Sequence, residues 1–190
     1  MDNTVGSLTE RQKSIIIGKL LGDGSLRRKV NTLLEVNHSY NQKDYVLWVY
    51  EELKQFVKTP PKLRVSGQNR LAFRFTTLSC SLLNPYYESF YDRMGKKVIP
   101  TFLNLDPLIL AVWLMDDGSK DRDSVYLNTQ QFDLTDQQLL LNKLLNLGIK
   151  SSLNKDKKYL RIRILKESVP KFIQLVDPYI LDSMRYKVLL

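Results

Sequence analysis

The chain of 190 residues has very few of the side chains that most often bind transition metals. Cys80 is its only cysteine and His38 is its only histidine. A single cysteine excludes an internal disulfide and a thiolate metal cluster, and a single histidine excludes a multi-histidine zinc centre. Acidic residues are also in deficit, because 20 Asp and Glu stand against 29 Lys and Arg, which gives a net charge of +9. This excess favours a polyanionic partner such as nucleic acid.

Long apolar runs and low-complexity segments are missing as well. No apolar run reaches the roughly 20 residues of a membrane helix, and no signal-peptide pattern opens the chain. We therefore expect a soluble, intracellular protein without a membrane partner, in either an organelle matrix or a prokaryotic cytoplasm. Hydrophobic residues make up 43% of the chain. That content and length suffice for one good core or for two small intertwined halves.

The most apolar stretch of the chain ends in two acids. Asp106 and Pro107 predict a helix start, with Asp as the N-cap and Pro at the first helical position. The next residues, 108–115, are all apolar, which is typical of a buried helix. Asp116 and Asp117 then stand at the end where the helix dipole favours cations, so they cost stability there. A functional reason for these acids is one interpretation, and a plain Asp-Gly turn after a core helix is the other.

A second apolar helix with the same ending lies earlier in the chain. Residues 16–24 read IIGKLLGDG and residues 110–118 read LAVWLMDDG. Asp23 and Asp117 each precede the final glycine, 94 positions apart (117 − 23). This repeat predicts a pseudo-twofold molecule with the two helices at its centre. Close approach of the helices needs small residues, and the two segments offer Gly18, Gly22 and Ala111.

The paired segments resemble the LAGLIDADG motifs of homing endonucleases in their single-chain, two-motif form. The eighth motif position falls on Asp23 and Asp117. The sequences MDDG at 115–118, LNTQ at 127–130 and MRYK at 184–187 resemble the yeast mitochondrial intron-encoded branch of that family. The resemblance extends over nearly the whole chain.

Three departures from the motif concern the packing of the two helices. Lys19 replaces an apolar residue in the first helix, Val112 and Trp113 make the second helix bulkier, and Asp116 stands where a small residue is usual. We expect a looser or offset helix crossing, with the two acids unaffected.

Each half reads helix, strands, helix, strands, helix, which is the α-β-β-α-β-β-α order of the resembled family. We predict an α+β fold of two pseudo-twofold-related repeats, with paired central helices and antiparallel DNA-binding sheets. Residues 1–95 form the first LAGLIDADG repeat, 96–105 the connection and 106–190 the second repeat, in one compact unit.

Local signals predict where some elements begin and end. Capping-box spacing predicts helix starts after Thr9 and Thr135. Alternating apolar residues predict strands over 33–38 and 125–131, and residues 67–69 read as a hairpin turn.

Alternation along the strands leaves one basic and polar sheet face in each half. We expect these faces to bind double-stranded DNA, with arginines at phosphates or guanine edges and amides at adenine edges. The expected DNA contacts are Arg28, Glu35, Asn37, Arg70, Arg74, Tyr126, Asn128, Gln130, Arg161 and Arg163. For any single one of them an ordinary solvated sheet face is the alternative.

Phosphodiester cleavage needs a metal held by hard oxygen ligands, and one acid from each half can supply them. The predicted metal site comprises Asp23, Asp117, Gly22 and Asp116. The resemblance implies Mg²⁺ as the cofactor, with Mn²⁺ able to substitute. Lys97 and Lys187 occupy comparable places after the last helix of each half, and lysines at the matching positions of the resembled branch belong to the active sites. We therefore predict these two lysines as catalytic residues together with the two motif acids.

The sequence thus predicts a monomeric, divalent-metal-dependent, site-specific DNA endonuclease. The resemblance implies cleavage of both strands across the minor groove of a long, asymmetric target. Two alternatives use the same scaffold: an intron maturase that binds intron RNA, and a DNA-binding regulator that does not cleave. The two acids argue against the regulator, since acids at helix C-termini cost stability unless a cation offsets them.

Overall fold

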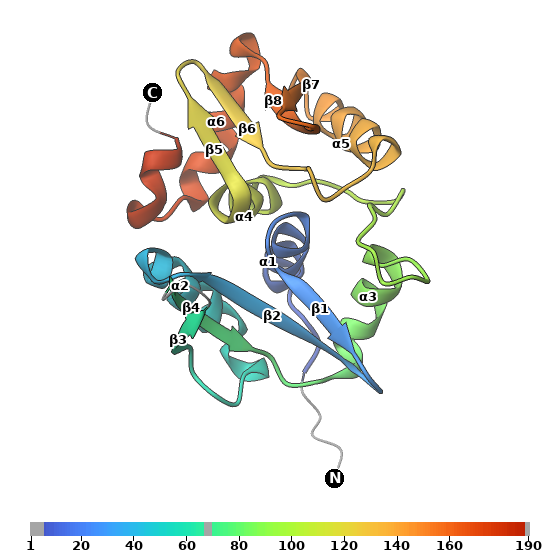
Figure 1. Ribbon diagram of the computed structural model, residues 1–190, viewed down its shortest axis with the longest axis vertical. Helices are drawn as coiled ribbons and strands as arrows, with labels where there is room; N and C mark the ends of the chain where they lie inside the picture. Colours follow the sequence, from blue (N-terminus) through green and yellow to red (C-terminus); the bar gives the residue numbers. More distant parts are fainter. Residues whose placement is uncertain (1–5, 67–69, 189–190) are drawn as a thin grey trace.

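Two halves with the same element order meet at a pair of central helices in the computed structural model (Figure 1). Residues 6–66 and 70–188 are described, so the expected turn at 67–69 lies outside them. The first half comprises α1 (Glu10–Leu21), β1 (Ser25–Arg28), β2 (Thr32–Ser39), α2 (Lys43–Leu53), β3 (Lys62–Ser66), β4 (Arg70–Thr76) and α3 (Asn84–Phe90). The second comprises α4 (Pro107–Asp117), β5 (Gly118–Asp121), β6 (Ser124–Leu127), α5 (Leu134–Asn146), β7 (Ser151–Asp156), β8 (Tyr159–Ile164) and α6 (Val169–Val176).

Each half carries one antiparallel sheet, and the two sheets have the same strand order. The first sheet runs β1-β2-β4-β3 and the second β5-β6-β8-β7. In the first, Val36 pairs with Phe75 and Asn37 with Arg74, so apolar and polar pairs alternate between the faces. In the second, Leu127 lies opposite Ile162. The α+β fold of two related repeats predicted from the sequence is confirmed.

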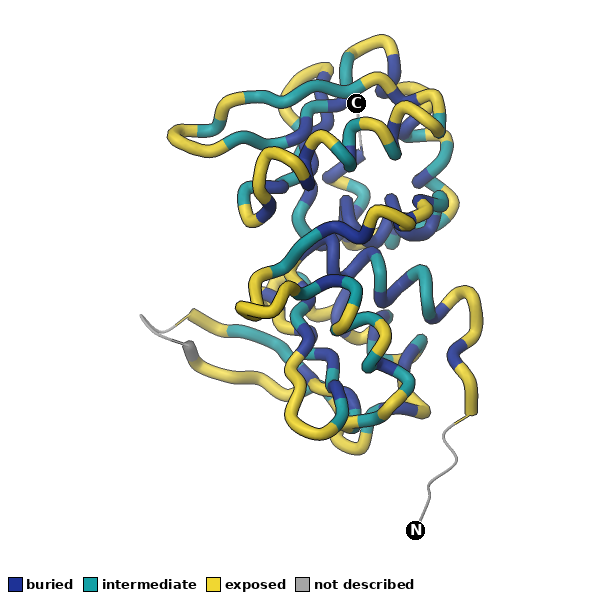
Figure 2. Tube along the Cα trace, turned by 90° about the vertical axis from the view of Figure 1, so that its right-hand side faces the viewer, coloured by how far each residue is buried: buried dark blue, intermediate teal, exposed yellow. Residues whose placement is uncertain are grey.

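Helices α1 and α4 pack against each other between the sheets (Figure 1), and in Figure 2 buried residues gather in the middle of the molecule. Every residue of α4 from Leu108 to Met115 is buried, as its uninterrupted apolar run predicts. The helices are close because Gly18 faces Val112: a Cβ on Gly18 would lie 2.6 Å from the Val112 Cβ. No helix within the described ranges is long and apolar enough to cross a membrane.

The local signals were right at some helix starts and wrong at others. The capping box at Thr9 is confirmed, since its side chain and the Gln12 side chain bond each other's backbone N–H. The one expected at Thr135 is wrong, because Asp133 caps α5 by accepting a hydrogen bond from the Asp136 N–H at 3.0 Å. The predicted strand 125–131 is also too long. It ends at Leu127, and a turn follows in which the Phe132 N–H donates to the Thr129 carbonyl.

The close helix contact predicts the effect of a methyl group at Gly18. Its Cβ would lie 2.9 Å from the backbone oxygen of Ile109 as well as against Val112, and neither neighbour is a mobile side-chain tip. Overpacking costs roughly 1–3 kcal/mol, against about 0.8–1.0 kcal/mol gained from helix propensity. We expect Gly18→Ala to lower the free energy of unfolding in urea. Gly6→Ala is the control, because nothing lies within 4 Å of its Cβ position. Unchanged or increased stability of Gly18→Ala would contradict the packing described here.

Candidate active site and nucleic-acid interface

The crossing of α1 and α4 brings the C-terminal ends of both helices, and with them the two motif acids, into one region. Asp23 follows α1, with 51% of its side chain exposed, and Asp117 is the last residue of α4 and half-buried. Burial and next the charge of Asp116 raise the pKa of Asp23. Burial raises the pKa of Asp117 to about 6, with the charges of Asp23 and Asp116 adding to the effect of burial. Burial therefore disfavours the charged form of both carboxylates, and a bound cation would offset that effect.

The Asp117 carboxylate is held by a side chain of its own half. Asn128, just beyond β6, donates from Nδ2 to the Asp117 Oδ1 at 3.0 Å. This hydrogen bond opposes the rise in the pKa of Asp117. The role of Asn128 as a DNA contact stays a prediction. Its amide donor is turned toward the acid, because the chain leaves the strand at Leu127, rather than standing on the open sheet face.

The two predicted catalytic lysines lie at the ends of different motif helices. Lys97 Nζ donates to the Gly22 carbonyl at 2.9 Å, beyond α1. Lys187 Nζ donates to the carbonyls of Leu114 at 3.1 Å and Met115 at 2.6 Å, in the last turn of α4. These contacts place a cation at the negative end of each helix dipole. Burial lowers the pKa of Lys97 to about 8 and also lowers that of Lys187.

A buried polar cluster lies between the halves, directly behind Asp23. Asp116 Oδ1 accepts from the Lys19 ammonium and from the Tyr45 hydroxyl at 3.1 Å, and it lies 2.8 Å from His38 Nε2. Its other oxygen, Oδ2, accepts the backbone N–H of Asp23 at 2.5 Å. Burial alone would raise the pKa of Asp116, but the charge of Lys19 and the donors around it hold that pKa well below its usual range. Asp116 is therefore a buried anion with both oxygens engaged.

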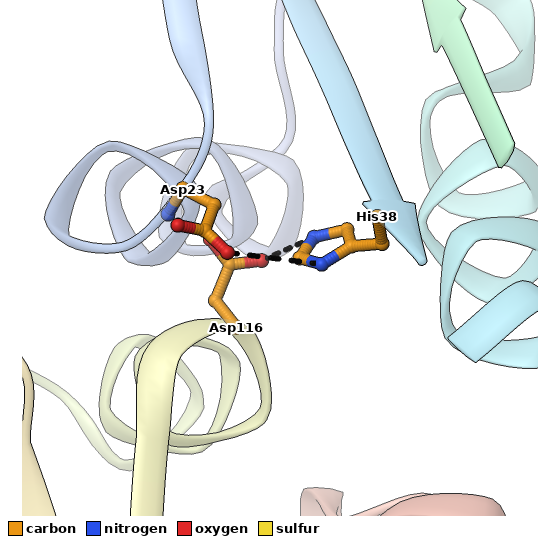
Figure 3. Close-up of side chains that lie close together, drawn as sticks. All are labelled: Asp23, His38 and Asp116. Carbon is orange, nitrogen blue, oxygen red and sulfur yellow. Dashed lines mark hydrogen bonds and ion pairs between the residues drawn. The ribbon is translucent and has the colours of Figure 1, made fainter. Parts of the chain in front are cut away.

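Asp23, His38 and Asp116 converge as metal ligands do (Figure 3). A cation of the protein already lies among them, because Lys19 Nζ contacts Asp116 and is 2.7 Å from His38 Nε2. The assignment of Asp116 as a metal ligand stays a prediction, and its oxygens already accept hydrogen bonds from protein donors in the core. The Gly22 carbonyl, expected in the same site, accepts from Lys97 and, at 3.2 Å, from Gln131.

The open face of the first sheet carries most of the basic residues predicted for it. Strand pairing sets Asn37 beside Arg74 and Glu35 beside Thr76, on the face opposite the buried Val36 and Phe75. The residues on this face are Arg27, Glu35, Asn37, Lys62, Arg64, Arg70, Arg74 and Thr76.

The expected position of Arg28 on the open face is wrong, because alternation places this residue on the helix-covered face. There its guanidinium donates to Glu88 at 2.8 Å and lies 5.8 Å from the centre of the Tyr87 ring, both on α3. The preceding Arg27 lies on the open face instead and pairs with Glu35 at 2.8 Å. Arg28 alternates with the buried Leu26 along β1, a strand that the sequence did not reveal, and therefore lies on the covered face.

On the open face of the second sheet, the side chains predicted to contact DNA also contact other side chains of the protein. The Arg161 guanidinium lies 4.0 Å from the centre of the Tyr126 ring and covers it, and Arg163 donates to the Ser124 hydroxyl at 3.0 Å. Gln130 lies beyond the strand and donates to Asp156 at 2.9 Å. The two arginines and Tyr126 share this face as predicted, whereas the amide donor of Gln130 is paired within the protein.

The fold agrees with the comparisons with known proteins. Residues 13–172 match the model of the LAGLIDADG DNA endonuclease family, and the chain belongs to this family. The homing endonuclease I-WcaI, solved bound to its DNA recognition sequence, matches 97% of this chain and 88% of its own with a TM-score of 0.90 at 26% identity. The single-chain homing-endonuclease fold expected from the paired motifs is confirmed.

Two curated relatives come from yeasts. The cytochrome b mRNA maturase bI2 of Saccharomyces cerevisiae is 33% identical over 99% of this chain. The chain spans only 49% of that maturase. The probable intron-encoded endonuclease 1 of Wickerhamomyces canadensis is 28% identical over 96% of this chain and 86% of its own length. The resemblance to the intron-encoded branch is therefore confirmed.

Sequence reasoning missed four residues around Asp23: Lys19, His38, Tyr45 and Gln131. Only Lys19 gave a usable signal, because a lysine within a buried apolar helix requires a buried counter-charge. The other three come from β2, α2 and the turn after β6, and nothing in their local pattern distinguishes them from ordinary core or surface residues.

The open sheet faces predict salt-sensitive DNA binding. We expect Arg161→Ala and Arg163→Ala to weaken binding, by about 1–3 kcal/mol for a base contact, or with a salt slope smaller by about 1 for a phosphate contact. Binding isotherms at several salt concentrations on a target duplex and an unrelated duplex separate the two cases. Affinity that does not fall between moderate and high ionic strength would count against DNA binding by these faces.

Neighbouring arginines on opposite faces provide a matched comparison for the first sheet. Arg27→Ala and Arg28→Ala remove the same charge at adjacent positions. Because only Arg27 faces the open side, we expect Arg27→Ala to weaken binding more. Equal loss of affinity in the two variants would mean that overall charge, not the open face, governs binding.

Proposed function

We propose that the chain cuts both strands of a long, asymmetric double-stranded DNA target in a reaction that requires a divalent metal. The observation that carries the proposal is that each motif helix ends in an acid and in a lysine that donates to its terminal carbonyls. Asp23 follows α1, where Lys97 donates to the Gly22 carbonyl. Asp117 ends α4, where Lys187 donates to the carbonyls of Leu114 and Met115. Each half thus contributes an acid and a cation, so one chain has the parts for two cleavage sites. On this basis we propose that the protein acts as a monomer.

The donors near the two acids suit a hard divalent cation. Carboxylate oxygens are what Mg²⁺ and Mn²⁺ prefer, and Asp23 and Asp117 supply them. The raised pKa values of the two acids are consistent with a cation being favoured there. We propose Mg²⁺, with Mn²⁺ able to substitute; once bound, the metal would polarise the scissile phosphate and lower the pKa of a bound water.

The remaining roles belong to the chain's own side chains. Asn128 fixes the rotamer of Asp117 through its hydrogen bond. Lys97 and Lys187 are proposed to stabilise the negative charge that develops on the phosphate, since their ammonium groups already lie at the helix ends. The open sheet faces hold the duplex across both halves through phosphate and base-edge contacts.

The direct test uses the gene's own flanking DNA, joined without the intervening sequence. Incubating this junction duplex with the protein and Mg²⁺ should produce double-strand breaks at one position. No cleavage of the junction in either metal, together with tight binding, would favour the non-cleaving regulator instead.

The acids predict a separation of cleavage from binding. We expect Asp23→Asn and Asp117→Asn each to reduce double-strand cleavage at least about a thousandfold, because several kcal/mol of metal stabilisation is lost and each 1.4 kcal/mol is worth a factor of ten. Specific binding should persist, because a lost negative charge reduces repulsion of phosphates. Gel-shift and cleavage assays on the same duplex measure the two effects.

Asp123→Asn is the control for this pair. Asp123 is exposed, at the turn between β5 and β6, and pairs with Lys166. Cleavage by Asp23→Asn or Asp117→Asn at the rate of the Asp123→Asn control would show that the motif acids are structural.

The lysines predict cleavage defects confined to one strand. Lys97 and Lys187 lie at different helix ends, so Lys97→Met should slow one strand and Lys187→Met the other, with nicked DNA accumulating. Lys96→Met is the matched control, because the exposed Lys96 pairs with Asp133 on the surface. The measurement is cleavage of a duplex labelled differently on its two strands. Equal slowing of both strands by each variant would refute the assignment of one lysine to each site.

A second candidate, intron maturase activity, is favoured by the similarity to the bI2 maturase. The same basic surface could hold folded intron RNA. Splicing of the host intron by the Asp23→Asn, Asp117→Asn double variant would establish this activity independently of cleavage.

A further inference from the structure

The peptide group between Gly22 and Asp23 is held at both of its polar atoms by side chains. Its N–H donates to Asp116 Oδ2 at 2.5 Å. Its carbonyl accepts from Lys97 Nζ at 2.9 Å and from Gln131 Nε2 at 3.2 Å. Asp116 and Gln131 belong to the second half, so the first motif acid is positioned from the opposite repeat.

Glycine at position 22 is what lets the carboxylate reach this peptide. A Cβ on Gly22 would lie 2.4 Å from the Asp116 Oδ2 and 2.6 Å from the Asp116 Cβ. Any larger residue would displace Asp116 from the Asp23 N–H. The small residue and the acid are therefore complementary parts of one contact.

The Asp116 carboxylate is itself fixed from behind. Lys19, His38 and Tyr45 surround its Oδ1, and all of these side chains are buried. A buried anion needs such a partner, and Lys19 supplies the full countercharge. The carboxylate consequently has little freedom to rotate away from the Asp23 N–H.

The arrangement does not recur in the second half. The 94-residue offset that relates Asp23 to Asp117 places Trp113 at the position of Lys19 and sets Gly22 opposite Asp116 in the repeat. Asp117 is held instead through its own carboxylate, by Asn128. The two acids are thus positioned by different means.

We propose that Asp116 is a positioning residue for Asp23. Asp116 is held in place by Lys19 and accepts the hydrogen bond of the Asp23 backbone N–H, and it thereby sets where the Asp23 carboxylate points. The inference rests on the proposed endonuclease function and assigns Asp116 a role other than metal ligand. An apolar replacement of a buried ion pair often preserves stability. What an apolar residue cannot replace is the acceptor for the Asp23 N–H.

Two double variants isolate that acceptor. Lys19→Met with Asp116→Asn, and Lys19→Met with Asp116→Leu, both remove the charge pair and keep similar side-chain volumes. Only asparagine offers an oxygen to the Asp23 N–H. Its NH₂ group can face Tyr45, whose hydroxyl is also 3.3 Å from the Val112 carbonyl and can donate there.

The first readout is amide hydrogen exchange of Asp23 in the free protein, followed by NMR. We expect exchange about tenfold or more faster with leucine at 116 than with asparagine, because the Asp23 amide loses its acceptor. The second readout is strand-resolved cleavage of the junction duplex over a range of Mn²⁺ concentrations. The leucine variant should need more Mn²⁺ and cleave about tenfold more slowly than the asparagine variant.

Thr77→Val is the matched control. The Thr77 hydroxyl is also a buried acceptor of a backbone N–H, that of Leu34 at 2.9 Å, but it lies at the far end of β4. We expect it to lower the melting temperature while leaving the Mn²⁺ dependence unchanged. If the leucine variant does not fold, Asp116→Ala in the Lys19→Met background removes the same acceptor.

The outcomes are distinguishable. Equal Asp23 exchange with asparagine and leucine, or equal Mn²⁺ dependence and rate, would overturn the positioning role. Absence of cleavage by the unmodified protein would instead overturn the proposed function. The exchange result would still test the hydrogen bond between the Asp23 N–H and Asp116.

Discussion

The close contact between α1 and α4 is the constraint on which the rest of the structure depends. Gly18 lets the helices approach until Val112 touches the opposite backbone, and Gly22 admits the Asp116 carboxylate. Both motif acids lie at the ends of these helices, so their relative position is set by helix packing rather than by loops. Rigid elements hold reactive groups more accurately than loops do, which suits a site that must engage two DNA strands together.

Acids at helix C-termini oppose the helix dipole, and this chain offsets their cost in two ways. Lys97 and Lys187 donate to the terminal carbonyls of the two motif helices, and Lys19 neutralises Asp116 within the core. Burial leaves Asp23 and Asp117 with raised pKa values, and neither carboxylate has an ion pair with a lysine or arginine among the described residues. A divalent cation would stabilise the protein most beside these two carboxylates. The electrostatics of the fold and the proposed chemistry therefore point to the same two residues.

Much of this could be predicted from the sequence, because repeats and apolar periodicity are local signals. The paired motifs located both central helices, both acids and the two-repeat fold, and alternation located most of the open sheet faces. Contacts between the halves could not be predicted in this way. Lys19 reaches Asp116 from 97 positions away, and Gln131 reaches Gly22 across the helix pair. Asn128 was misplaced because strand β6 ends at Leu127. Arg28 was misplaced because it alternates with the buried Leu26 along β1, a strand that the sequence did not reveal.

The central claim is that the motif acids, and not the buried Asp116, hold the metal. The most direct measurement is anomalous X-ray diffraction from crystals of the protein with the junction duplex and Mn²⁺. The account predicts anomalous density beside the Asp23 and Asp117 carboxylates, with the Lys19 ammonium still in contact with Asp116. Density between Asp116 and His38, with Lys19 displaced, would contradict it.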